Sequence, residues 1–145
     1  MEMRRRHPLP MLLLFLLIWQ GGSAVADELV VVVNGGVNAE RLSGRDLLEL
    51  FSLRKGQWPD GQPVRVLALD KDHNLHQRFC RDLLKLASYR LEWFWSRHLY
   101  AGFGGAPQRF DSVEALRTAL AVTPGAIGYL QQEDLNDQVK ALVVE

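Results

Sequence analysis

The residues best suited to chemistry form one polar run that follows the second predicted strand. They are Asp70, Lys71, Asp72, His73 and Asn74. An apolar strand precedes this run and a helix with apolar residues at helical spacing follows it, so the run joins a strand end to a helix start. The first amides of a helix lack partners within the helix and favour an anion, and Lys71, His73 and Asn74 add donors. The sequence therefore presents this run as a candidate ligand-binding site for a small oxyanion.

Two other interpretations of the same stretch stay open. In the first, Asp70 or Asp72 caps the helix and occupies the amides that an anion needs, which gives a ligand-free turn. In the second, Asp70, Asp72, His73 and His76 surround a metal ion, because two histidines three residues apart share one side of a helix. Spacing alone does not show that these groups converge, so we predict no metal site and no cofactor. In the oxyanion interpretation, His76 could donate a further hydrogen bond to the anion, whereas Arg78 is less well placed to reach it.

The sequence contains none of the common catalytic patterns. It has no Gly-x-Ser-x-Gly turn, no His-Glu-x-x-His helix and no pair of carboxylates in an apolar setting. The one cysteine, Cys80, lies in a helical pattern with Phe79 and Leu83, so it is predicted to be a small buried apolar residue. We therefore expect a binding protein and not an enzyme.

The elements that must position the polar run alternate between strands and helices. Strands are predicted at 29–34, 63–69, 124–130 and 139–144, because apolar and β-branched residues are concentrated there. Helices are predicted to begin at Ser43 (with Asp46 three residues later, resembling a capping box), after His73 and running to about Leu86, at Ser88, and at Asp111 or Ser112. The order β-α-β-α-α-α-β-β predicts an α/β fold with a central mixed or mainly parallel sheet flanked by helices.

Aromatic residues are concentrated in the helix predicted to begin at Ser88. They are Tyr89, Trp93, Phe94, Trp95 and Tyr100. Such a group is most often core, and we predict that here, with Trp93 or Trp95 the more exposed member. A ligand platform or a partner surface is the alternative. The Gly/Pro-rich segment 102–108 is predicted to be a connector.

The N-terminus has the three parts of a secretory signal peptide. Arginines at 4–6 precede an unbroken apolar run, 11–19, that is too short to span a membrane. Ala24 and Ala26 then occupy the two small-residue positions of a signal-peptidase site. We therefore expect residues 1–26 to be removed by cleavage after Ala26 and the remainder to be periplasmic.

Residues 27–145 are expected to form a single domain without a membrane span. They hold 14 lysines and arginines and 16 aspartates and glutamates. A nucleic-acid-binding domain usually carries a clustered basic face, and this sequence shows none, so nucleic acid is not an expected partner.

Four segments together resemble a known family. They are Val31-Val32-Val33-Asn34, Trp58-Pro59-Asp60-Gly61, the Tyr/Trp-rich stretch 89–95, and Thr123-Pro124-Gly125-Ala126-Ile127-Gly128-Tyr129. In this order they resemble the phosphate-specific periplasmic substrate-binding proteins of ABC transporters, and more closely the short single-lobe relatives of those proteins. The resemblance implies one lobe of a periplasmic-binding-protein-like fold, phosphate or another small oxyanion as ligand, and an ABC permease or membrane sensor as partner.

The sequence departs from the family's pattern at the ligand. Two-lobed members close on the anion, and the first lobe has no counterpart here. After the strand that ends at Leu69, the family has a loop of the type Arg-Ser-Asp-Gly-Ser-Gly-Thr, whereas this chain has neither hydroxyl groups nor glycines at 69–75. The alternative function is therefore a ligand-free protein–protein interaction module of a cell-envelope sensor or complex that has kept the fold.

Overall fold

The computed structural model describes residues 26–102 and 104–145. The signal peptide predicted at 1–26 lies outside these residues except for Ala26. The described elements, in chain order, are β1 (Leu29–Asn34), β2 (Arg41–Leu42), α1 (Gly44–Phe51), β3 (Arg65–Leu69), α2 (Asn74–Phe79), the π-helical turn η1 (Cys80–Leu84), α3 (Ser88–Tyr100), β4 (Gln108–Phe110), α4 (Val113–Val122), β5 (Ala126–Gln131), the short η2 (Gln132–Asp134) and β6 (Val139–Val144). None of the helices formed by the described residues is long and apolar enough to cross a membrane.

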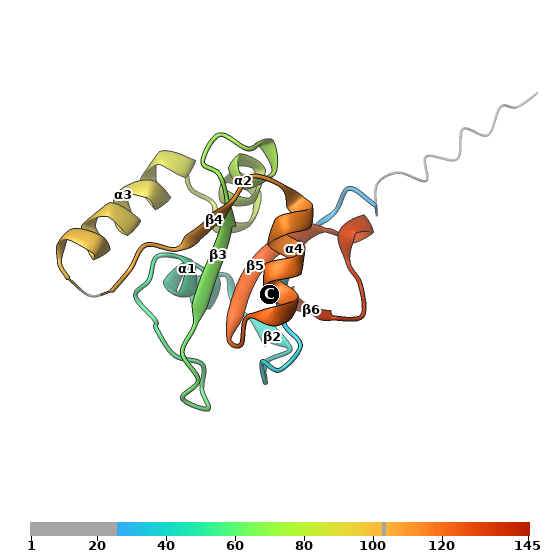
Figure 1. Cartoon of the computed structure of the whole chain (residues 1–145). Helices are drawn as coiled ribbons and strands as arrows, with labels where there is room; N and C mark the ends of the chain where they lie inside the picture. Colours follow the sequence, from blue (N-terminus) through green and yellow to red (C-terminus); the bar gives the residue numbers. More distant parts are fainter. Residues whose placement is uncertain (1–25, 103) are drawn as a thin grey trace, which may run out of the picture.

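One six-stranded sheet runs through the molecule in the order β2-β6-β1-β5-β3-β4 (Figure 1). β1 pairs antiparallel with β5 and β6, and the other three pairings are parallel. The predicted mixed sheet with interleaved helices is therefore confirmed. The sequence did not reveal β2 and β4, because strands of two and three residues are too short to show alternation.

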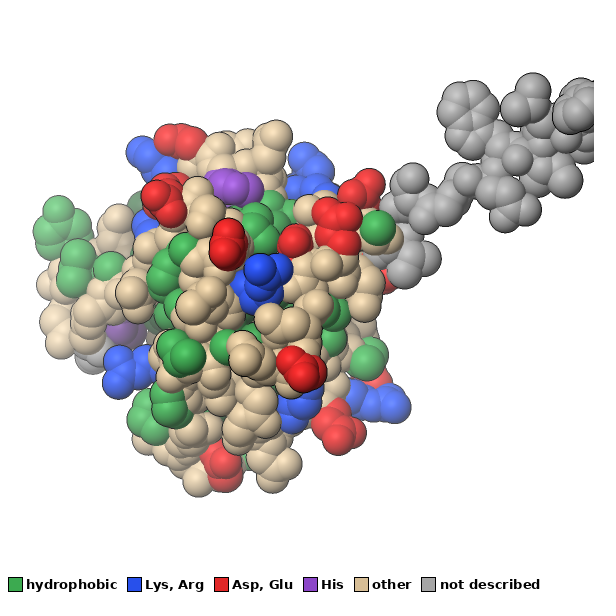
Figure 2. Space-filling view, turned by 45° about the vertical axis from the view of Figure 1, so that its right-hand side comes forward, with side chains coloured by type: hydrophobic (Ala, Val, Ile, Leu, Met, Phe, Trp, Pro, Cys, Tyr) green, Lys and Arg blue, Asp and Glu red, His purple; other side chains and the backbone are tan. Residues whose placement is uncertain are grey.

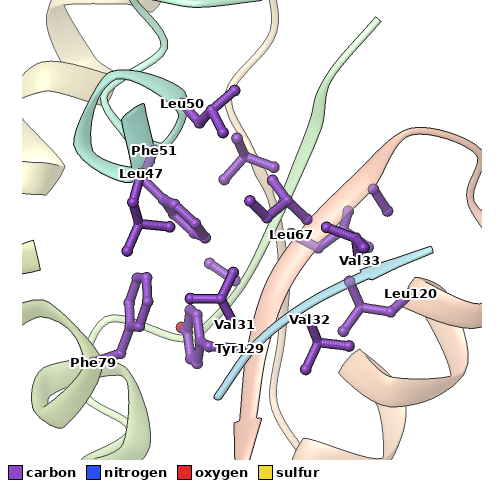
Figure 3. Close-up of a cluster of buried hydrophobic side chains, with 14 of the residues drawn as sticks. Val31, Val32, Val33, Leu47, Leu50, Phe51, Leu67, Phe79, Leu120 and Tyr129 are labelled. Carbon is purple, nitrogen blue, oxygen red and sulfur yellow. The ribbon is translucent and has the colours of Figure 1, made fainter. Parts of the chain in front are cut away.

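The strand register assigns each face of the sheet to different helices. Val31 pairs with Tyr129 and points to the side covered by α1 and α2, where Tyr129 stacks on Phe79 at 4.1 Å between ring centroids (Figure 3). Val32 pairs with Gly128 and points to α4 on the other side. A Cβ on Gly128 would lie 3.1 Å from a methyl carbon of Leu120, so the glycine lets α4 approach the sheet closely.

Two of the predicted helix caps are confirmed and one is wrong. Ser43 Oγ accepts the Asp46 amide at 3.0 Å, and Ser112 Oγ accepts the Ala115 amide at 3.1 Å. Ser88 does not cap α3: Ala87 holds the N-cap position, without a side-chain hydrogen bond, and Ser88 is the first helical residue. The helix predicted to run to Leu86 instead ends earlier, because it widens into the π-helical η1 and then meets Lys85 in the left-handed conformation.

The aromatic residues of α3 divide between the core and the surface. Trp95 is buried and its indole N–H donates to the Phe51 carbonyl at 2.6 Å, as expected of a core tryptophan. Trp93 is exposed, which confirms that one of the two tryptophans faces solvent, whereas Tyr89 and Tyr100 are exposed although they were predicted to be core. The reason is that α3 packs inward through Leu91 and Trp95, and the other aromatics lie on the opposite side of the helix.

Candidate functional site

The polar run singled out in the sequence lies at the edge of the sheet where the parallel strands β3 and β5 end. The Asp70 amide donates to the Phe110 carbonyl at 2.9 Å, which ties the start of the run to the end of β4. α4 begins at the same edge, shortly after β4. The run therefore sits where three strand ends and two helix starts meet, at the carboxyl edge where open α/β sheets bind ligands.

The five candidate residues differ in their surroundings. Asp70, Lys71 and Asp72 are exposed, and within the described residues their side chains have no hydrogen bond or ion pair. His73 is the N-cap of α2, and its Nδ1 accepts the Leu75 amide at 3.1 Å. The prediction that a side chain of this run caps the helix is thus confirmed, but the capping residue is His73 and not Asp70 or Asp72.

A pocket of about 380 Å³ opens beside this turn, and we call it the strand-end pocket. His73 and Asn74 line it, whereas Asp70, Lys71 and Asp72 do not. Its wall carries several hydrogen-bond donors and no carboxylate. The lining residues are His73, Asn74, Leu75, Gln77, Arg78, Arg81, Val113 and Gln131.

The positive charge of the strand-end pocket comes from two arginines one helical turn apart. Arg78 donates to the Asp27 carbonyl and lies 3.8 Å from Asp82, and the Arg81 Nε donates to Asp82 Oδ1 at 2.9 Å. The hydrogen bond from Arg81 and the positive charges of Arg81, Arg78 and Lys85 lower the pKa of the Asp82 carboxyl. Arg78, considered less well placed from the sequence, therefore shares a pocket with His73 and Asn74. Arg81 was missed, although its spacing from Arg78 puts both on one side of the helix.

His76 does not belong to the pocket. Its side chain is fully buried, and Nδ1 lies 2.5 Å from the Tyr129 hydroxyl oxygen. That hydroxyl also accepts the Leu69 amide at 2.9 Å, and the His76 tautomer that gives the hydroxyl hydrogen an acceptor at Nδ1 has its ring proton on Nε2. Burial, together with the positive charge of Arg109, lowers the pKa of His76 to about 4, against the opposing effect of Glu92. The expectation that His76 donates to an anion is wrong.

The proton on His76 Nε2 faces two groups inside the molecule. Glu92 Oε1 and Cys80 Sγ each lie 3.7 Å from this nitrogen. Cys80 is buried as predicted, and burial raises its pKa to about 12, so its thiol stays protonated at neutral pH. Because His76 points into the core while Asp70 and Asp72 point to solvent, the four residues considered as metal ligands do not converge. The described residues contain no group of three or more suitable side chains around a common point.

Arg109 binds the carbonyl of Leu69, the residue whose amide donates to Tyr129. It forms an ion pair with Glu92, donates to the Leu69 carbonyl at 3.2 Å, and lies over the Trp95 ring at 4.8 Å. Both backbone polar groups of Leu69, the last residue of β3, are therefore held by side chains from other elements. This arrangement fixes the point at which the polar run leaves the sheet.

Three solved structures share this arrangement of elements. An ABC-type phosphate transport receptor from Vibrio cholerae matches with a TM-score of 0.64 at 16% identity, over 81% of this chain and 46% of the receptor. A putative phosphate ABC transporter substrate-binding protein with bound phosphate from Clostridium perfringens gives 0.67 at 14%, over 81% and 45%. PstS from Borrelia burgdorferi gives 0.61 at 13%, over 82% and 47%. No protein-family model and no curated protein matches the chain.

These similarities confirm the fold expected from the sequence. The chain has the fold of phosphate ABC-transporter substrate-binding proteins, with a six-stranded mixed sheet flanked by helices. It spans less than half of the length of each of these three proteins.

Proposed function

We propose that this chain is a single-lobe solute-binding domain that holds a small oxyanion, with phosphate as the first candidate, in the strand-end pocket. The observation that carries the proposal is the composition of the pocket wall. Two guanidinium groups, an imidazole and three side-chain amides face a space of about 380 Å³, and no carboxylate lines it. Hydrogen-bond donors that carry positive charge suit a compact oxyanion.

The roles of the donors follow from their present partners. The Asn74 amide has no hydrogen bond within the described residues, and the Nδ1 of His73 is occupied by the Leu75 amide, so His73 offers its Nε2. Arg78 and Arg81 supply the charge, and both can turn from Asp82 towards an anion. Lys71 is exposed next to the pocket and adds attraction at longer range, while Asp70 and Asp72 weaken it. Of the five residues singled out in the sequence, His73 and Asn74 are the proposed direct contacts.

The affinity of such a site is modest. The pocket is open to solvent, and exposed ion pairs contribute little each. Asp82 also competes with any anion for the two arginines. A partner that covers the pocket would raise the affinity, because it would exclude water from these contacts.

The biological setting proposed with this site is the periplasm. Residues 1–26 are removed as a signal peptide, 27–145 form the binding domain, and an ABC permease or membrane sensor receives the liganded form. The neighbours of known structure are transport proteins, and the strand-end pocket has no acid–base pair or nucleophile, which supports a binder and not an enzyme.

Heat unfolding in the presence of phosphate tests the proposal, with sulfate as the control anion. Phosphate at ten times its Kd should raise the free energy of unfolding by about 1.4 kcal/mol, which corresponds to a few degrees in Tm. Arg81→Gln should weaken phosphate binding, because it removes a donor. Asp82→Asn should strengthen it about two- to fivefold, because it removes the acceptor that competes for Arg78 and Arg81.

The two variants are matched, since both change one exposed side chain of η1 and each alters the charge by one. Opposite effects on phosphate affinity place the anion at these arginines. Equal effects, or no phosphate dependence of Tm in the unaltered protein, would refute the proposed site.

A further inference from the structure

The outward side of α3 is formed by aromatic and cationic residues, and we call it the α3 outer face. Positions 89, 93, 97 and 100 recur at helical spacing, so their side chains lie along one side of the helix. The exposed fractions are 72% for Tyr89, 53% for Trp93 and 90% for Tyr100. The members of the face are Tyr89, Arg90, Trp93, Arg97 and Tyr100. A solvent-facing helix side normally carries charged and polar residues, so three large rings in one row need an explanation.

The charge of the α3 outer face is positive. Arg97 places its guanidinium 4.8 Å from the centre of the Trp93 ring, and Arg54 lies 5.5 Å from the centre of the neighbouring Phe94 ring. Glu92, the one carboxylate of α3, lies on the inner side and is paired with Arg109. By contrast, residues 27–145 as a whole carry two more acidic than basic side chains. The positive charge is thus localised beside the aromatic rings.

The α3 outer face projects from the rest of the molecule. Figure 1 shows α3 at the periphery, at the end of the molecule away from β6, and Figure 2 shows hydrophobic side chains protruding at that end. The three rings and two guanidinium groups project from a helix about 20 Å long, and a hollow of about 340 Å³ lies between Tyr89, Arg90, Trp93 and Phe94.

We propose that the α3 outer face docks this protein reversibly on an anionic phospholipid surface. Tyrosine and tryptophan rings are suited to the headgroup layer, because they combine an apolar body with one polar group. Arginine pairs with phosphate groups in the same layer, and a stacked arginine such as Arg97 is already held in place for this contact. A projecting helix side can reach the headgroup layer of a flat membrane surface. The proposal is independent of the strand-end pocket, since no residue of the face lines that pocket.

Vesicle flotation of the segment 27–145 tests this docking. This segment is appropriate because, among the described residues, the first one that belongs to the hydrophobic core or packs against it is Leu29. The protein should float with vesicles of equimolar phosphatidylcholine and phosphatidylglycerol, and not with phosphatidylcholine alone. Arg90→Gln with Arg97→Gln should lower the partition coefficient about 25-fold, since each arginine near an anionic surface contributes about fivefold. High ionic strength should also lower the partition coefficient, because salt screens the attraction between the arginines and the anionic lipids.

Two further variants separate the aromatic contribution from charge and from folding. Trp93→Ser with Tyr100→Ser should reduce flotation strongly while leaving the Tm and the phosphate response unchanged, because both side chains are exposed. Ser96→Ala is the control on the same helix and should float like the unaltered protein. The proposal would be overturned if all variants floated equally or if the protein did not bind anionic vesicles. Binding to soluble polyglutamate in place of vesicles would also overturn it, and would assign the face to an acidic protein partner.

Discussion

Leu69 is the residue on which the geometry of the candidate site depends. Its amide is held by Tyr129, which contacts His76, and its carbonyl is held by Arg109, which pairs with Glu92. His76 and Tyr129 are buried, and a charge on a buried imidazole without a hydrogen-bonded counter-ion is costly. The neutral form of His76 is therefore a condition for the observed end of β3.

The stability of the protein should fall as pH is lowered through the range in which His76 titrates. The pKa of His76 is about 4 in the folded protein and about 6.5 in an unfolded chain. Between these values the unfolded state takes up a proton that the folded state excludes, so stability present above pH 6.5 is lost towards pH 4. The loss from this one group is about 3 kcal/mol, measured by urea unfolding at a series of pH values.

His76→Gln provides the comparison for this prediction. The variant has no titrating group at this position, so its free energy of unfolding should depend less on pH between 6.5 and 4, even though it is less stable at neutral pH. The same pH dependence in both proteins would show that His76 is not buried in its neutral form.

At the scale of elements, the two turns that carry the family resemblance are in contact. The Trp58 indole N–H donates to the Gly125 carbonyl at 3.0 Å, and the Arg65 amide donates to the same oxygen at 3.0 Å. Gly125 has a φ of +76°, and a Cβ there would lie 2.1 Å from the Pro63 carbonyl oxygen. These motifs thus hold the beginnings of β3 and β5 together, at the sheet edge opposite the strand-end pocket. Their resemblance to the family supports the fold and says little about the ligand.

Gly125→Ala should destabilise the protein by at least about 2 kcal/mol, because alanine is strained at positive φ and its Cβ meets backbone that cannot move freely. Gly56→Ala is the control: a Cβ at Gly56 has nothing within 4 Å, and the change should be within about 0.5 kcal/mol. Chemical denaturation of the two variants measures the difference. Equal stabilities would contradict the close approach of the two turns.

The sequence predicted the elements better than the surfaces that they present. Strands β1, β3, β5 and β6 were recognised because apolar residues were concentrated in them. The caps at Ser43 and Ser112 were recognised because each serine directly precedes a helical pattern, where its hydroxyl can accept the amide three residues later. β4 was missed, since it exists only through its pairing with β3.

The missed features of the site depend on which side of a helix is buried. His73 and His76 look alike in the sequence, yet one lines a pocket and the other is in the core. The four-residue spacing of His76 and Cys80, next to Phe79, was the pattern that could have placed His76 inside. In α3 both sides carry aromatic residues, so periodicity alone could not tell Trp95 from Trp93.

At the scale of the whole molecule, the proposed oxyanion site is open on one side. It spans less than half of the length of its structural neighbours, and its strand-end pocket is open to solvent. An anion held there would contact the donors of this chain on one side and water, or a covering partner, on the other. The function proposed here therefore requires specificity from His73, Asn74, Arg78 and Arg81 alone when no partner is present.

The most direct test of this claim is a phosphate titration followed by amide and arginine side-chain resonances of the isotope-labelled protein. Saturable shifts are expected only at residues 73–81 and the neighbouring ends of α4 and β5, including the Nε–H signals of Arg78 and Arg81, with weaker changes for sulfate. Shifts absent at millimolar phosphate, or gathered elsewhere on the surface, would contradict an oxyanion site at the strand ends.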